Sequence, residues 1–143
     1  MFIKQISIFV ENKPGRLSKV AKLLGENGID IRALSVADTR DFGILRLIVT
    51  NPDAACEVLK NAECTVSINN VIAIGIKDEP GGLAEVMEAL YAANISIEYM
   101  YAFLSKSDDQ ACVILRVDNN DKAIEAMKEN DFKVLTSKEV YEM

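Results

Sequence analysis

The sequence contains no histidine and no tryptophan among its 143 residues, and only three of its residues are cysteines. Histidine is the usual general base near neutral pH and the commonest metal ligand. Its absence excludes Ser-His-Asp and Cys-His catalysis, and we expect neither a metal nor another cofactor. Cys56, Cys64 and Cys112 are odd in number and include no C-x-x-C pair, so they indicate neither a disulfide framework nor a zinc knuckle. We expect them to be free thiols in the core.

Basic charge is also scarce, because 16 lysines and arginines face 22 aspartates and glutamates, for a net charge of −6. Without a basic field nothing on the chain gathers phosphate groups, so we expect no nucleic-acid partner and no membrane partner. No stretch approaches the ~18 consecutive apolar residues of a membrane span, and the first residues do not resemble a signal peptide. A soluble cytoplasmic protein is the expectation.

The chain contains an internal repeat. The segment Lys13–Leu17 (KPGRL) is answered by Glu79–Leu83 (EPGGL), and the same offset carries further apolar positions of the first copy onto apolar positions of the second. The matched positions are Ile6, Ile8 and Val10 with Ile72, Ile74 and Ile76, and Val20 and Leu24 with Val86 and Leu90. We therefore predict two domains, residues 1–69 and residues 70–143.

Hydrophobic periodicity assigns the same elements to each copy. Alternation over 5–10 predicts a strand, and apolar spacing over 16–27 predicts an amphipathic helix that stops at Gly28, as its counterpart stops at Asn94. The remaining elements of the first copy are strands over 29–37 and 42–50, a helix from 51 to 62, and a strand over 64–68. In the second copy they are strands over 95–104 and 110–117, a helix opening at 119–121, and a strand beginning at Phe132.

This order, strand, helix, strand, strand, helix, strand, predicts an α+β fold made of two tandem ferredoxin-like βαββαβ units with antiparallel sheets. Asn69 and Asn70 form the only break between the copies, so we expect the units to pack as one body. A cleft between packed units is a common place for a small ligand.

The strand-to-helix junctions are the most similar parts of the two copies. Each has a Pro-Gly pair before a helix, at Pro14-Gly15 and Pro80-Gly81. A helix start presents unpaired N–H groups and partial positive charge, which suit a carboxylate. The alternative is that Pro-Gly only turns the strand into the helix.

The motifs NKPGRL followed by NGIDI, and DEPGGL followed by ANISI, resemble the signature of ACT domains, the amino-acid-sensing modules of biosynthetic enzymes. The resemblance covers residues 3–69 and 70–137. It implies that a free amino acid binds between paired modules, held by the loop before the first helix and by the start of the second strand. The positions that match this pattern are Asn12, Lys13, Gly15, Arg16, Leu17, Ile29 and Asp30 in the first copy, and Asp78, Gly81, Gly82, Leu83, Asn94, Ile95 and Ser96 in the second.

Both charges of an amino acid find counterparts among these positions. We hypothesise that the carboxylate lies against the N–H groups that follow Gly15 or Gly81, and that the ammonium meets acceptors such as Asn12, Asp30 or Asp78. We expect unequal sites, because Lys13 and Arg16 make the first loop cationic, whereas Asp78 and Gly82 make the second acidic and open.

Three functions remain in competition at this point. The first is a stand-alone tandem ACT-like module, a homodimer that binds an amino acid and allosterically regulates amino acid metabolism, with a separate biosynthetic enzyme as a candidate partner. The second is a ligand-independent structural subunit. The third is a small acyl-phosphate hydrolase that uses Arg16 at a helix start, which is disfavoured because the second copy has Gly82 there. We expect a protein that is not an enzyme.

Overall fold

A computed structural model describes residues 2–11, 13–38, 41–103 and 110–142. The chain divides into two compact units. The N-terminal unit is Lys4–Asn69, and the C-terminal unit is Asn70–Met143 together with Met1–Ile3. The candidate residue Asn12 lies outside the described residues.

The N-terminal unit is a four-stranded antiparallel sheet with two helices. Its elements are β1 (Ile3–Glu11), α1 (Arg16–Glu26), β2 (Ile31–Asp38), β3 (Phe42–Val49), α2 (Pro52–Asn61) and the first part of β4 (Thr65–Lys77). Its strands neighbour one another in the order β2-β3-β1-β4. Strand β3 pairs antiparallel with both β1 and β2.

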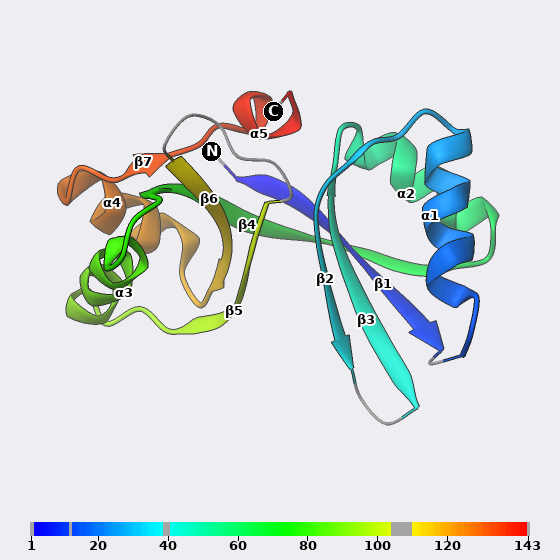
Figure 1. Cartoon of the computed structure of the whole chain (residues 1–143), viewed down its shortest axis with the longest axis horizontal. Helices are drawn as coiled ribbons and strands as arrows, with labels where there is room; N and C mark the ends of the chain where they lie inside the picture. Colours follow the sequence, from blue (N-terminus) through cyan, green and yellow to red (C-terminus); the bar gives the residue numbers. More distant parts are fainter. Residues whose placement is uncertain (1, 12, 39–40, 104–109, 143) are drawn as a thin grey trace. The chain divides into compact units, whose positions relative to one another are not determined.

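The C-terminal unit repeats this plan (Figure 1). Its first strand is the second part of β4, and the elements that follow are α3 (Gly82–Ala92), β5 (Ile97–Ala102), β6 (Gln110–Val117), α4 (Asn120–Glu129), β7 (Lys133–Val134) and α5 (Ser137–Tyr141). The strand order β7-β4-β6-β5 corresponds to that of the first unit, and β4 pairs antiparallel with β6 and β7, as β5 does with β6. The prediction of two βαββαβ units is confirmed.

The helix boundaries follow from local chemistry. The side-chain oxygen of Asn51 accepts a hydrogen bond from the Ala54 N–H at 3.2 Å, and Asn119 does the same for Lys122 at 3.0 Å, so each second helix has the asparagine cap that the sequence predicts. After each first helix the chain turns through a left-handed residue, Gly28 at φ 70° and Asn94 at φ 58°. Both stops were placed correctly by the sequence.

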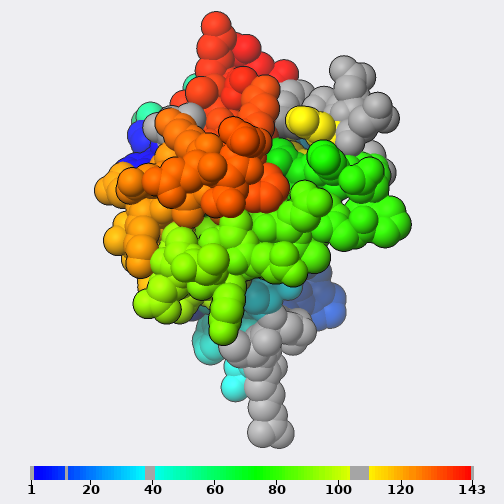
Figure 2. Space-filling view, turned by 90° about the vertical axis from the view of Figure 1, so that its left-hand side faces the viewer, coloured from blue at the N-terminus to red at the C-terminus, as the bar shows by residue number. Residues whose placement is uncertain are grey.

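Each unit has its own hydrophobic core between the helices and one face of its sheet. In the N-terminal unit this core includes Ile6, Ile8, Leu24, Leu47 and Leu59. In the C-terminal unit the matching core includes Ile72, Ile74, Leu90, Leu115 and Met127. Figure 2 shows α3 in yellow-green and α4 in orange lying side by side as the outer layer over the second core.

One predicted strand end is wrong, although the chain does divide into its two units between Asn69 and Asn70. The sequence suggests a break at Asn69 and Asn70, but β4 continues without interruption from Thr65 to Lys77. One strand is therefore the last of the first unit and the first of the second. Asparagine has a low preference for strands, but here the Asn69 side chain accepts from the Ser7 hydroxyl at 2.8 Å and the Asn70 carbonyl accepts from the Arg116 guanidinium at 2.7 Å.

None of the helices in the described part of the chain combines the length and hydropathy that a bilayer span requires.

Candidate functional site

The two strand-to-helix junctions share an unusual backbone. Gly15 and Gly81 stand at the N-caps of α1 and α3 with φ of 86° and 88°, a left-handed conformation that favours glycine. Neither cap residue supplies a side-chain hydrogen bond, in contrast to the asparagines that cap α2 and α4. The Arg16 and Gly82 N–H groups donate to the backbone carbonyls of Lys13 and Glu79 at 3.3 and 3.0 Å, so the next N–H groups of each first turn are the ones left without a capping side chain.

At the first junction a carboxylate holds the two cations. The Glu11 carboxylate lies 3.0 Å from the Lys13 ammonium and 3.6 Å from the Arg16 guanidinium. The hydrogen bond from Lys13 and the charges of Lys13 and Arg16 hold the pKa of Glu11 below its usual range. The group keeps one positive charge in excess. Glu11 was not among the predicted site residues, although its position at the end of an alternating strand could have suggested it.

At the second junction Gly82 is buried and takes the place of Arg16. A Cβ at Gly82 would overlap the carbonyl oxygen of Lys77, so only glycine fits without a shift of the backbone. The prediction that Gly82 opens this loop is therefore wrong, because the absence of a side chain lets two backbone segments approach closely. Asp78 is exposed, as its predicted role requires.

The other predicted residues lie at the far end of the first helix in each unit. Helix α1 has 11 residues and a length of about 16 Å, so within one unit the Gly15 junction and the start of β2 are separated by that distance (Figure 1). One unit alone does not bring the two predicted halves of the site together.

At that far end the predicted side chains have different surroundings. Ile29 and Ile95 are 6% and 7% exposed and belong to the cores. Asp30 is exposed and pairs with Arg32 at 2.9 Å. The Ser96 N–H donates to the Asp118 carboxylate at 3.1 Å, and Asn94 forms the left-handed turn.

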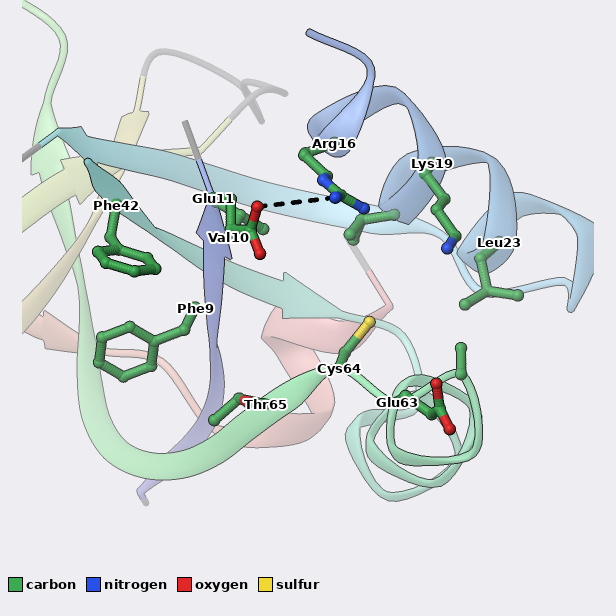
Figure 3. Close-up of a pocket in the computed structure, with 12 residues that line it drawn as sticks. Phe9, Val10, Glu11, Arg16, Lys19, Leu23, Phe42, Glu63, Cys64 and Thr65 are labelled. Carbon is green, nitrogen blue, oxygen red and sulfur yellow. Dashed lines mark ion pairs between the residues drawn. The ribbon is translucent and has the colours of Figure 1, made fainter. Parts of the chain in front are cut away.

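A cavity of about 340 Å³ lies beside the first junction (Figure 3). Its lining side chains come from the end of β1, one face of α1, the start of β3 and the turn between α2 and β4. Its lining includes Phe9, Glu11, Arg16, Lys19, Phe42, Glu63 and Cys64. Apart from Arg16, sequence reasoning missed these residues, because no single motif links them.

The C-terminal unit has a cavity of about 290 Å³ at the corresponding place. Its lining replaces Glu11 with Lys77 and Lys19 with Glu85, so the charges of the strand end and the helix are exchanged between the units. Phe9 and Phe42 are replaced by Gly75 and Gln110. The hollow is thus a feature of the fold, whereas its chemistry differs between the copies.

The family model of the ACT domain pair matches residues 1–143. The chain belongs to the ACT domain family. This ACT pair is 31% identical over 137 residues to the aspartokinase of Corynebacterium glutamicum and 30% identical to that of Corynebacterium efficiens. Each alignment covers 84% of this chain and 31% of the relative, so the ACT pair spans about a third of these curated proteins.

Solved structures show the same fold. A protein from Bacteroides thetaiotaomicron is 41% identical, with a TM-score of 0.94 over 100% of this chain and 98% of its own. The regulatory subunit of aspartate kinase from Thermus thermophilus, in a ligand-free form, is 20% identical, with a TM-score of 0.64 over 88% of this chain and 91% of its own. The ACT pair of this protein therefore has the fold of a known regulatory subunit.

Proposed function

We propose that this protein is a regulatory ACT pair that binds a free amino acid and acts on a separate enzyme of amino acid metabolism, without being an enzyme itself. Its membership of the ACT family and its likeness to aspartokinases support this proposal. The observation that carries it is the left-handed glycine at the N-cap of both α1 and α3, which supplies no side-chain cap to the N–H groups that follow Arg16 and Gly82 in the first turn. Those groups suit the carboxylate of an amino acid.

The separation along α1 favours a site completed by a second copy. Strand β2 stands at the end of the strand order, and an apolar groove of about 120 Å³ runs between it and α1. Leu17, Leu34 and Val36 line the groove, and each is about 40% exposed or more. A second copy related by a two-fold axis would cover this surface and bring the Gly15 junction of one copy to the Asp30 end of the other. We infer a homodimer for this reason.

The ligand's two charges then have separate partners. The carboxylate meets the first-turn N–H groups with Lys13 and Arg16 nearby, since these two cations exceed the single charge of Glu11. The ammonium meets Asp30 at the other end. Ser96 takes the corresponding position in the second unit, whereas Asp78 lies at the Gly81 junction. The acidic Asp78 and the missing cation at Gly82 make the second site the weaker one for a carboxylate.

Thermal unfolding of the full-length protein against each of the twenty amino acids tests the proposal. A ligand at 100 times its dissociation constant adds about 2.7 kcal/mol of stability, so one or a few amino acids would raise the midpoint by several degrees. The double variant Lys13→Ala/Arg16→Ala would lose most of that rise. Lys22→Ala is the matched control, because it removes a cation from the same helix at an exposed pair with Glu26.

A flat response to all twenty amino acids would contradict the proposal. The ligand-independent structural subunit would then be the better account, since the groove of Leu17, Leu34 and Val36 could be covered by another copy with or without a ligand.

A further inference from the structure

The turn that ends α1 contains an asparagine followed by a glycine, Asn27-Gly28, a pair that occurs once in the sequence. Both residues are exposed. An asparagine side chain is chemically labile when the backbone nitrogen of the next residue can reach its carbonyl carbon, and glycine hinders that nitrogen least because it has no Cβ. The function proposed above does not use the Asn27 side chain, so its chemistry is a separate question.

The folded turn holds both of the groups that would react. The Asn27 side-chain N–H donates to the Leu23 carbonyl at 2.8 Å, and the Gly28 N–H donates to the Gly25 carbonyl at 3.1 Å. Asn27 has φ −97° and ψ 14°. At this ψ the Gly28 nitrogen is turned away from the Asn27 Cβ, so a ring between them closes only after rotation about the Cα–C bond. The closed turn therefore protects the asparagine.

An equivalent turn ends α4 and provides an internal control. Asn130 has φ −100° and ψ 15°, and its side-chain N–H donates to the Ala126 carbonyl at 2.8 Å. The next residue, Asp131, is left-handed at φ 62°, as Gly28 is at φ 70°, and its N–H donates to the Lys128 carbonyl at 3.1 Å. The two asparagines thus share backbone and side-chain bond, whereas the residues whose nitrogen would attack differ.

The end of α1 is also the weaker of the two helix ends. Helix α1 has no basic residue in its last turn, whereas Lys128 lies in the last turn of α4, where a cation interacts favourably with the helix dipole. Gly25 lies in the last turn of α1, and glycine has a low helix preference. Helix ends open locally at a small part of the free energy of global unfolding. Such opening frees the Asn27 amide and the Gly28 nitrogen together.

We propose that Asn27 is a site of spontaneous deamidation, which proceeds when the last turn of α1 opens. The Gly28 nitrogen forms a bond to Cγ of Asn27, the bond from Cγ to the side-chain nitrogen breaks, and ammonia leaves with the proton of the Gly28 nitrogen. A five-membered succinimide ring results. Water then adds to one of the two ring carbonyls and opens the ring to aspartate or isoaspartate. The reaction needs only water as a co-reactant.

The products do not fit the turn. A carboxylate at Asn27 cannot donate to the Leu23 carbonyl, and it adds negative charge to the end of α1 where the helix dipole is already negative. Isoaspartate also lengthens the backbone by one methylene group just before Ile29, which is 6% exposed in the core. Deamidation therefore destabilises the connection from α1 to β2. This inference does not depend on the amino-acid site, so the two can fail separately.

Peptide mapping by mass spectrometry of the full-length protein, incubated at pH 8, tests the proposal. Succinimide, aspartate and isoaspartate are expected at Asn27, and they form there roughly tenfold faster or more than at Asn130. In guanidinium chloride the rate at Asn27 rises by roughly a further tenfold or more, because opening of the turn no longer limits it. The deamidated fraction, separated by ion exchange, would unfold at a lower urea concentration than the unmodified protein.

Gly28→Asn is the matched control variant. Asn94 has the corresponding place in the second unit at φ 58°, so an asparagine fits this left-handed position. An unchanged unfolding midpoint would show that the variant folds, and its Asn27 would react at the slow rate of Asn130.

The proposal would be overturned if Asn27 stays intact in the folded protein over the time in which the denatured chain is converted. Equal rates at Asn27 and Asn130, or a Gly28→Asn variant that reacts as fast as the original chain, would also overturn it. Equal rates at Asn27 in the folded and the denatured protein would contradict the protection by the closed turn.

Discussion

The two units of this ACT pair agree where the fold needs a particular residue and differ where it does not. Both have a left-handed glycine before the first helix, a left-handed stop after it and an asparagine cap on the second helix. At the position after the glycine, however, one unit has the exposed cation Arg16 and the other has the buried Gly82. The shared residues are those that the fold requires. The residues that differ set the charge that each junction presents to a ligand.

The charged side chains beside the two junctions also differ between the units. Glu11 on β1 is held by Lys13 and Arg16, with Lys19 nearby on α1, whereas Lys77 and Glu85 hold the equivalent positions in the second unit. A fold requires neither arrangement, because all of these side chains reach solvent. The junction of the first unit is thus the better place for an anionic group. The junction of the second unit, which has the same backbone and different charges, serves for comparison.

The largest expected effect concerns Gly82. Gly82→Ala would place a Cβ against the Lys77 carbonyl and destabilise the protein by about 1–3 kcal/mol, as overpacking does. Gly25→Ala, on the exposed side of α1 with open space around it, would instead stabilise by up to about 1 kcal/mol. Urea unfolding of both variants measures the difference. Equal effects would mean that the close approach at Gly82 is not present.

A smaller effect on stability is expected at the start of α5, a helix that only the C-terminal unit has among the described residues. The Thr136 hydroxyl accepts from the Glu139 N–H at 3.2 Å, and the Glu139 carboxylate accepts from the Thr136 N–H at 2.8 Å. Thr136→Ala would cost about 1 kcal/mol of stability. Urea unfolding at pH 7 measures it, and Ser137→Ala, which leaves the reciprocal bonds intact, would cost less.

The same pair predicts a dependence on pH. The Thr136 N–H, and then Lys133, lower the pKa of Glu139, so its contribution to stability is present above the ordinary glutamate pKa of 4.5 and is lost as the pH falls through the lower folded value. Glu139→Gln would remove this part of the acid sensitivity. Urea unfolding from pH 7 to pH 3 would show it, and parallel curves for the two proteins would contradict the pairing.

The smallest effect concerns thiol reactivity. Burial raises the pKa of Cys112 to about 12, whereas Cys64 is half-buried and lines the cavity beside the first junction. At pH 8 a disulfide reagent would modify Cys64 first and Cys112 only on unfolding. Cys64→Ser would abolish the fast phase. A fast phase that survives in Cys64→Ser would show that a core thiol is open to solvent.

Local sequence predicted the elements well because periodicity and capping act over a few residues. The stops at Gly28 and Asn94, the caps at Asn51 and Asn119, and the paired junctions are all of this kind. The continuity of β4 was missed because strand partners distant in sequence decide it. The close approach at Gly82 was missed for the same reason, since it depends on which backbone segments the fold brings together.

The central claim is that an amino acid completes a site between two copies of this chain. Sedimentation velocity over a concentration series, with and without the amino acid that raises the unfolding midpoint most, tests it directly. Because ligand binding and association are linked, the dimer dissociation constant would fall at least tenfold at saturating ligand, and Arg16→Ala would reduce this change. An amino acid that binds and leaves self-association unchanged would contradict the claim.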